Sequence, residues 1–313
     1  MSNAQITTRY SRWVDVLQEH LTRARASGGV FARSVVRPPW GLCLPGTIQL
    51  AVHAVVRGHA WLWLDDPQAA FKLVPGDVAL VRGGPDHSIA HSPTATCMTA
   101  DEFLARYSDD EQASDPEATV FLCGAYQFAG DVGSQLVEAL PPALHLPHAD
   151  DDPLHDAIGL LSRELATPAP GQQTVLDRLL DVVLVHALRA SFRQSPQAPL
   201  WYQASTDARL DPALRAIHTD AAHPWTVPEL AARSGLSRAA FARAFQQTLG
   251  QAPMQYLTEW RMTLARDHLR AGDLSLAQIA SRAGYTSPYA FAAAFRRHHG
   301  RPPGRWRQDH ADA

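Results

Sequence analysis

The C-terminal part of the chain contains one pattern twice, LAARSGLSRAAFARAF at residues 230–245 and IASRAGYTSPYAFAAAF at residues 279–295. Before each copy, a hydroxyl residue is followed three positions later by Glu or Gln: Thr226 with Glu229, and Ser275 with Gln278. This capping box predicts a helix start, because the two side chains satisfy backbone N–H groups that a helix leaves free. Two short helices are therefore expected to begin in the same way.

Each of these helices is expected to end at a glycine, Gly235 or Gly284, where a left-handed conformation is favoured. A second helix then starts at Ser237 or Ser287 and carries a buried pair at helical spacing, formed by Phe241, Phe245, Phe291 and Phe295. Two helices joined by a short glycine turn make a helix-turn-helix, whose second helix enters the DNA major groove. A solenoid is the alternative, but two copies are fewer than the three or so it needs.

The charge distribution supports the DNA interpretation. Residues 1–204 carry 14 basic and 22 acidic residues, a net charge of -8, whereas residues 205–313 carry 14 basic and 9 acidic residues, a net charge of +5. A basic segment on an acidic body indicates that only the C-terminal part meets a polyanion.

Together with PMQYLTEWRMTLARDHL at residues 253–269, the two repeats closely resemble the DNA-binding domain of the AraC/XylS family of bacterial transcription regulators, over roughly residues 207–305. The resemblance implies two recognition helices in successive major grooves, with double-stranded DNA and RNA polymerase as partners. It also implies DNA contacts by Arg238, Ala239, Ala242, Arg243, Pro288, Tyr289, Arg296 and Arg297. Arg243 is the expected base reader, whereas Ala293 stands where many members have Arg, so the second helix is expected to read bases weakly and to hold phosphates through Arg296 and Arg297.

The N-terminal part has a different texture. Alternation at residues 48–57 and short apolar runs separated by Gly and Pro predict antiparallel strands. The segments VVRGHAWLWL (55–64), LVPGDVALVRGGPDHSIAH (73–91) and FLCGAYQF (121–128) are similar to the cupin-type domain of one branch of the family, which implies a double-stranded β-helix barrel. The expected fold is α+β: a cupin-like sensory domain at 1–145, a helical linker at 146–204 and the DNA-binding domain at 205–313.

The pattern between these domains predicts a loop at 93–118, helices at 153–166 and 173–193, and an irregular linker at 194–204. The second helix is apolar around much of its circumference. This width fits either core packing or a partner surface, and a homodimer is expected on the second interpretation.

Three signals are possible for the sensory domain. A divalent metal would bind His53 and His87, although cupin enzymes use a fuller ligand set, which is incomplete here. An oxidant would act on Cys123, Cys97 or Cys43, of which Cys123 is in the CG dipeptide of that branch. A small molecule would fill an apolar pocket among Trp40, Trp61, Trp63, Phe121 and Tyr126.

Other classes of protein are disfavoured. Three cysteines argue against a disulfide scaffold, and the chain has neither a run of about 18 apolar residues nor an apolar N-terminal stretch, so a cytoplasmic protein without membrane contact is expected. The predicted function is a sequence-specific transcription regulator, not an enzyme and with no certain cofactor. The alternative is a metal-dependent cupin enzyme with a DNA-binding appendage.

Overall fold

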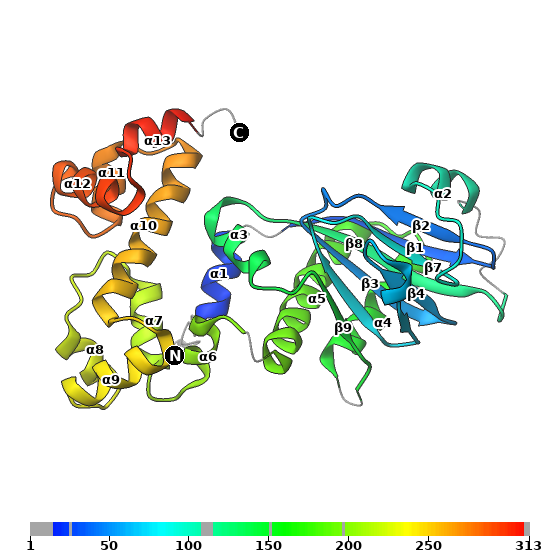
Figure 1. Cartoon of the computed structure of the whole chain (residues 1–313), viewed down its shortest axis with the longest axis horizontal. Coiled ribbons are helices and arrows are strands. Elements are labelled where there is room, and N and C mark those ends of the chain that lie inside the picture. The colour runs from blue at the N-terminus through cyan, green and yellow to red at the C-terminus, as the bar shows by residue number, and fades with distance from the viewer. Residues whose placement is uncertain (1–14, 25–26, 108–114, 150–151, 196–197, 310–313) are drawn as a thin grey trace, which may run out of the picture. The chain divides into compact units, whose positions relative to one another are not determined.

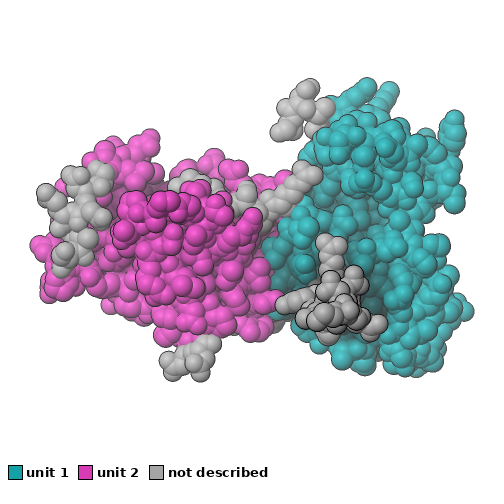
Figure 2. All heavy atoms as spheres, turned by 180° about the vertical axis from the view of Figure 1, so that it is seen from behind, with its two compact units in different colours: residues 1–23, 130–132, 199–313 teal, residues 24–129, 133–198 magenta. Residues whose placement is uncertain are grey.

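The computed structural model describes residues 15–24, 27–107, 115–149, 152–195 and 198–309. Contacts divide the chain into two compact units, coloured separately in Figure 2. Residues 24–129 and 133–198 form the barrel unit, and residues 1–23, 130–132 and 199–313 form the helical unit. The predicted boundaries at 145 and 204 stay a prediction.

Two antiparallel sheets form the barrel unit, which confirms the α+β class. The first has the order β1-β8-β3-β6-β9 and the second the order β2-β7-β4-β5. The strands of the first sheet are β1 (Ser27–Val36), β3 (Leu50–Arg57), β6 (Val78–Arg82), β8 (Thr119–Gln127) and β9 (Ala143–Leu146). Those of the second are β2 (Gly41–Leu44), β4 (Ala60–Trp63), β5 (Phe71–Leu73) and β7 (His87–Ala90).

Strand β3 is buried on both faces of the sheet, although alternation of the kind seen at residues 48–57 is typical of a strand with one solvated face. Residues 50–55 are all buried. One face contributes Ala51 and Val55 to the core shared by the two sheets. The other is covered because α4 (Pro153–Ala166) and α5 (Gln172–Gln194) pack on the five-stranded sheet (Figure 1). The helices expected at 153–166 and 173–193 are thus present, and they cover a sheet.

The predicted loop at 93–118 is wrong in one part, because residues Ala100–Tyr107 form helix α2. Thr99 and Glu102 make a further capping box, in which the Thr99 N–H donates to Glu102 Oε2 at 2.9 Å. Phe103 then anchors the helix in the core with 2% exposure. The acidic residues around this segment obscured the signal. The remaining elements of the unit are the 3-10 turn η1 (Pro67–Ala69) and α3 (Gly130–Glu138), whose first residues fall in the helical unit.

The helical unit has two separate cores. The larger one joins α7 (Asp211–Thr219), α8 (Val227–Arg233) and α9 (Arg238–Leu249) to the first half of α10 (Pro253–Ala271). The smaller one joins the second half of α10 to α11 (Leu276–Arg282), α12 (Pro288–His299) and α13 (Pro303–Asp309). Helices α1 (Val16–Ala24) and α6 (Leu200–Thr206) also belong to this part of the fold. The predicted linker at 194–204 is therefore too long, since α6 begins at Leu200 and buries Ala204.

Among the described residues, no helix is both long enough and apolar enough to cross a membrane.

Candidate nucleic-acid interface

Both predicted capping boxes are formed. At the start of α8, the Glu229 N–H donates to Thr226 Oγ1 at 3.4 Å, and the Thr226 N–H donates to Glu229 Oε2 at 2.8 Å. At the start of α11, the Gln278 N–H donates to Ser275 Oγ at 3.3 Å, and the Ser275 N–H donates to Gln278 Oε1 at 2.9 Å. Each box satisfies N–H groups at a helix start, so the two first helices begin alike.

The turns that follow are also equivalent. Gly235 and Gly284 have φ angles of 64° and 73°, in the left-handed region predicted for them. The next helices are capped by the side chains of Ser237 and Ser287. Their paired phenylalanines have 0% exposure and belong to the two separate cores: Phe241 and Phe245 in one, Phe291 and Phe295 in the other. Two helix-turn-helix units are the result.

The outer faces of α9 and α12 hold the residues expected to contact DNA. Ala242 is half-buried, and the other seven are exposed: Arg238, Ala239, Arg243, Pro288, Tyr289, Arg296 and Arg297. Tyr289 is 88% exposed, the largest fraction among the exposed large hydrophobic residues. In the described part of the chain, the side chains of the four arginines of this set make no ion pair or hydrogen bond with another residue. Four guanidinium groups are thus free to meet phosphates or base edges.

Arg261, on α10, connects the two helix-turn-helix units. Its Nε donates to the carbonyl of Ala221 at 2.6 Å, and its Nη2 donates to the carbonyl of His223 at 2.8 Å, both in the loop before α8. The same Nη2 lies 2.6 Å from the place that a Cβ on Gly284 would occupy. A glycine is needed there for space as well as for its positive φ angle. Arg261 thus contacts the loop of one unit and the turn of the other.

Inside the barrel unit, the structure brings His53 and His87 together. Their Nε2 atoms lie 2.9 Å apart, and His53 Nδ1 lies 2.9 Å from Cys123 Sγ. Burial lowers the pKa of His53 well below 6.5 and that of His87 to about 4, so both imidazoles are neutral at physiological pH. Neutral imidazoles whose ring nitrogens face each other can share a hydrogen bond or ligate a metal.

This pair does not form a full metal site by itself. Metal sites usually take about three or four protein ligands. Across the described ranges, no group of three or more His, Cys, Asp or Glu side chains converges in a way that could hold a metal. Cys123 contacts the opposite nitrogen of the His53 ring, so its sulfur does not point at the space between the two Nε2 atoms.

The three cysteines occupy two different places. Cys123 is partly buried against the barrel core, and burial raises the pKa of its thiol. Cys43 is exposed, and its Sγ lies 3.3 Å from Ser88 Oγ, whereas Cys97 is half-buried, and its Sγ lies 3.8 Å from the Ala95 carbonyl oxygen. Burial raises the pKa of Cys97 to about 11. The Leu42–Met98 bridge thus places Cys43 and Cys97 on neighbouring backbone segments, whereas Cys123 lies beside His53.

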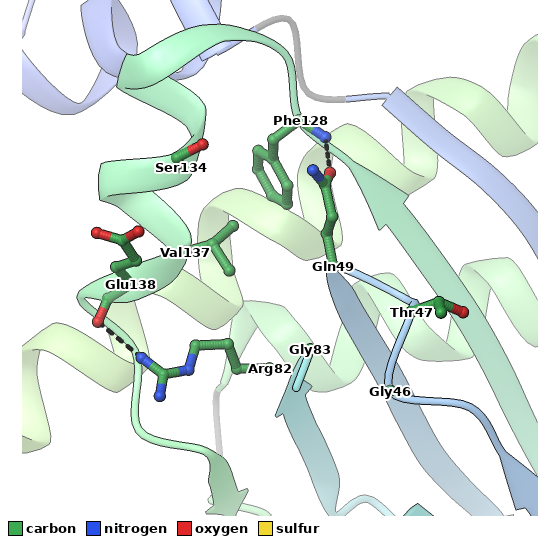
Figure 3. Close-up of a pocket in the computed structure, with 9 residues that line it drawn as sticks. All are labelled: Gly46, Thr47, Gln49, Arg82, Gly83, Phe128, Ser134, Val137 and Glu138. Atoms are coloured by element: carbon green, nitrogen blue, oxygen red, sulfur yellow. Dashed lines mark hydrogen bonds between the residues drawn. The ribbon is translucent and has the colours of Figure 1, made fainter. Parts of the chain in front are cut away.

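A pocket of about 400 Å³ opens on the barrel unit beside α3 (Figure 3). Arg82 Nη1 donates to the carbonyl of Glu138 at 3.0 Å across it, and the Phe128 N–H donates to Gln49 Oε1 at 2.6 Å. The lining combines these polar groups with apolar side chains: Gly46, Thr47, Gln49, Arg82, Gly83, Phe128, Ser134, Val137 and Glu138. This pocket could not be predicted from the sequence, because its residues come from three separate segments.

The aromatic residues expected to line a pocket inside the barrel have structural roles where they are buried. The rings of Trp40 and Phe121 stack at 4.9 Å, and these residues are 1% and 0% exposed. The Tyr126 hydroxyl donates to the carbonyl of Leu180 on α5 at 2.8 Å. These three residues therefore contribute to packing.

Two antiparallel sheets around one core, on the same chain as paired helix-turn-helix units, define a DNA-binding regulator with a sensory domain. Residues 15–193 match the Cupin family, and residues 230–309 match a helix-turn-helix domain family. The chain belongs to the AraC-like transcription regulators.

Similar proteins span nearly the whole chain. A putative AraC-like transcription regulator of Streptomyces antibioticus is 31% identical over 94% of this chain and 99% of its own length. The HTH-type transcriptional regulator AlkR of Acinetobacter baylyi is 29% identical over 86% of this chain and 91% of its own. The RCS-specific HTH-type transcriptional activator RclR of Escherichia coli is 25% identical over 94% and 98%. A solved DNA-binding domain of AdpA, in complex with a target DNA, is 33% identical over 32% of this chain and 91% of that chain, with a TM-score of 0.31.

Proposed function

We propose that this transcription regulator inserts α9 and α12 into successive major grooves of its target DNA. The observation that carries the proposal is the pair of like-built units whose second helices present arginines without partners in the described chain. A recognition helix contacts base edges with its N-terminal residues. Arg238, Ala239, Ala242 and Arg243 would occupy that part of α9, and Pro288 and Tyr289 that part of α12.

The two helices would have different roles, with α9 reading bases and α12 mainly contacting phosphates. Arg243 can reach a guanine with two hydrogen bonds, the commonest specific arginine contact. On α12, Tyr289 offers a ring for apolar contact, whereas Arg296 and Arg297 lie in the last turn. Arginines at that end suit phosphates, which fix position but carry no base identity. The first helix would therefore supply most of the sequence preference.

DNase footprinting of the full chain on sites mapped across the genome tests this proposal. Two protected segments on one face of the duplex, about 34 Å apart, are expected. Binding should weaken steeply as salt rises. A chain that shows no preference for any genomic fragment over random duplex would contradict the proposal.

For the barrel unit, a small-molecule effector is supported by the pocket beside α3, whose volume of about 400 Å³ falls in the usual range for ligand sites. A divalent metal at His53 and His87 is a second effector, supported by the 2.9 Å approach of their Nε2 atoms. Metal analysis of the purified chain and of His53→Ala separates the two. A stoichiometric metal that is lost in the variant supports the metal, and the same content in both contradicts it.

Homodimerisation is supported by apolar side chains on the outside of the α4–α5 pair. Val175 and Val182 lie seven residues apart on α5, on one face of the helix, and are 44% and 42% exposed, and Leu160 on α4 is 47% exposed. The proposed setting is the cytoplasm, where the bound regulator would meet RNA polymerase. Val182→Lys should shift a dimer toward monomer in light scattering, whereas Val175→Ala should not.

A further inference from the structure

The exposed side chains in the first two turns of α12 carry no charge and no amide group. They are those of Pro288, Tyr289, Ala290 and Ala293. The only polar atom in these four side chains is the Tyr289 hydroxyl oxygen. Pro288 has no backbone N–H, and the Ala290 N–H donates to Ser287 Oγ at 3.1 Å. This part of the helix therefore offers few hydrogen-bonding groups to the edge of a base.

The corresponding part of α9 has the opposite character. Counted from the two serine caps, Arg238 corresponds to Pro288, and Arg243 corresponds to Ala293. The arginines of α12 lie instead in its last turn. Since the N-terminal residues of a recognition helix contact the bases, α9 presents guanidinium groups to them, whereas α12 presents an apolar surface.

Tyr289 contributes most of this apolar surface. The residue is 88% exposed, whereas Leu104, the next most exposed of the large hydrophobic residues, is 53% exposed. Across the described ranges, the Tyr289 ring contacts no other aromatic ring, and its hydroxyl makes no hydrogen bond. Ala293 is exposed four residues further along, and thus on the same face of the helix. Tyr289 and Ala293 together form what we call the apolar patch of α12.

We propose that the apolar patch of α12 selects thymine in the DNA segment that this helix contacts. Every base shows hydrogen-bonding groups in the major groove, but only thymine adds a methyl group, at C5. A hydrogen-bonding group covered by an apolar surface loses water without gaining a partner, which is unfavourable. A methyl group gains from the same burial. The inference rests on the proposed function, because it requires α12 to enter the groove.

The preference for thymine is smaller than the preference that Arg243 provides. Burial of one methyl group changes a binding constant by about fourfold. A bidentate arginine–guanine contact changes it by about 5- to 160-fold. Since Tyr289 and Ala293 are roughly 5–6 Å apart at Cβ and a base-pair step is about 3.4 Å, the patch should cover about two neighbouring base pairs.

The test titrates the full chain against its mapped site, with the thymines replaced one at a time by deoxyuridine. Uracil pairs with adenine as thymine does and lacks only the methyl group. Replacement of a contacted thymine should weaken binding about fourfold, whereas replacement between the two protected segments should leave the affinity unchanged. Cytosine at the contacted position should also weaken binding, and 5-methylcytosine should recover most of the loss.

The outcomes separate this inference from the proposed function. Two protected segments together with unchanged affinity for every deoxyuridine duplex would overturn the selection of thymine and leave the proposed function supported. A chain without any specific footprint would overturn both.

Variants of Tyr289 locate the contact. Tyr289→Ala should bind the thymine and uracil duplexes with nearly equal affinity, whereas Tyr289→Phe keeps the ring and should keep the difference. Leu104→Ala is the matched control, since it removes an exposed apolar side chain from the barrel unit. Circular dichroism spectra identical to that of the parent chain show that each variant is folded. A difference that persists in Tyr289→Ala or disappears in Tyr289→Phe would contradict the assignment to the ring. So would a Tyr289→Ala chain that binds DNA normally but fails in transcription, because Tyr289 would then contact RNA polymerase.

Discussion

The two helix-turn-helix units have the same internal frame and different outer faces. Both start at a capping box, turn at a glycine with positive φ, and bury a phenylalanine pair. On the outside, Arg243 of the first unit corresponds to Ala293 of the second, and Ala239 corresponds to Tyr289. Frame positions are fixed by backbone hydrogen bonds and by packing, whereas outer positions are free to vary with the DNA that each helix meets.

The cores behind the two frames also differ in extent. The first unit shares its core with α6 and α7, including Leu210, Leu214 and Ile217. Among the described residues, the core of the second unit gains only α13 beyond its own helices and α10, with Trp306 as the main contribution. The second unit thus has fewer buried neighbours with which to absorb a defect.

Removal of a core phenylalanine is the largest perturbation of this comparison. Phe241→Ala and Phe291→Ala should each cost about 3 to 5 kcal/mol, the usual penalty for a buried Phe→Ala change. Hydrogen exchange of the full chain should show lost protection in α8 and α9 for the first variant, and in α11 and α12 for the second. If either variant exposed both units equally, the two cores would be one cooperative element.

Loss of the expected base reader is the next perturbation. Arg243→Ala should weaken binding to the specific site by about 1 to 3 kcal/mol and relax the preference at one base pair. Titration against the mapped site and its single-base variants measures both effects. Arg297→Ala is the matched control, since loss of a phosphate contact should weaken all sequences alike and reduce the salt slope by about 1. An unchanged affinity and footprint in Arg243→Ala would remove this residue from the reading set.

Substitutions in the capping boxes test whether the caps stabilise the two helix-turn-helix units equally. Thr226→Ala and Ser275→Ala should each destabilise their own unit by about 1 kcal/mol, since one N–H at each helix start loses its acceptor. Local hydrogen exchange at α8 and α11 measures the two losses side by side. A loss confined to one unit would show that the second frame is held by packing rather than by its cap.

The smallest expected effect is a difference in pH dependence between the two capping boxes. Hydrogen bonds from the Thr226 side chain and backbone lower the pKa of Glu229 below 4.5, whereas Gln278 does not titrate. Because the folded pKa is lowered, the stabilisation from Glu229 is present above pH 4.5 and is lost as pH falls through the folded value. Protection of α8 should thus decrease under acid relative to α11. Glu229→Gln should remove the difference between the two helices.

The local features of the fold were predictable from the sequence. Capping residues, glycine turns and buried phenylalanines act within a few positions of the chain, so their patterns indicated both helix-turn-helix units correctly. The box at Thr99 and Glu102 had the same form but was missed among acidic residues, which favour solvent. The order of the strands in the two sheets could not be predicted from the sequence, because pairings such as β1 with β8 join segments about ninety residues apart.

Contacts across such distances also decide the sensory residues. The approach of His53 to His87 depends on how the two sheets face each other. No spacing in the sequence predicts this contact. By contrast, the exposure of Arg238, Arg243, Arg296 and Arg297 follows from helical periodicity once the phenylalanines are placed inside.

Arg261 contacts the loop at 221–223 and Gly284, and it thereby links the two helix-turn-helix units at a fixed spacing. Both units are also attached to the continuous helix α10, so the distance between their recognition helices cannot change unless α10 bends. One base pair inserted between the two contacted segments of an operator displaces them by about 3.4 Å and about a tenth of a turn. Such an operator would accept only one of the two recognition helices at a time. Promoters of this regulator should therefore tolerate base changes under α12 far better than a change in spacer length.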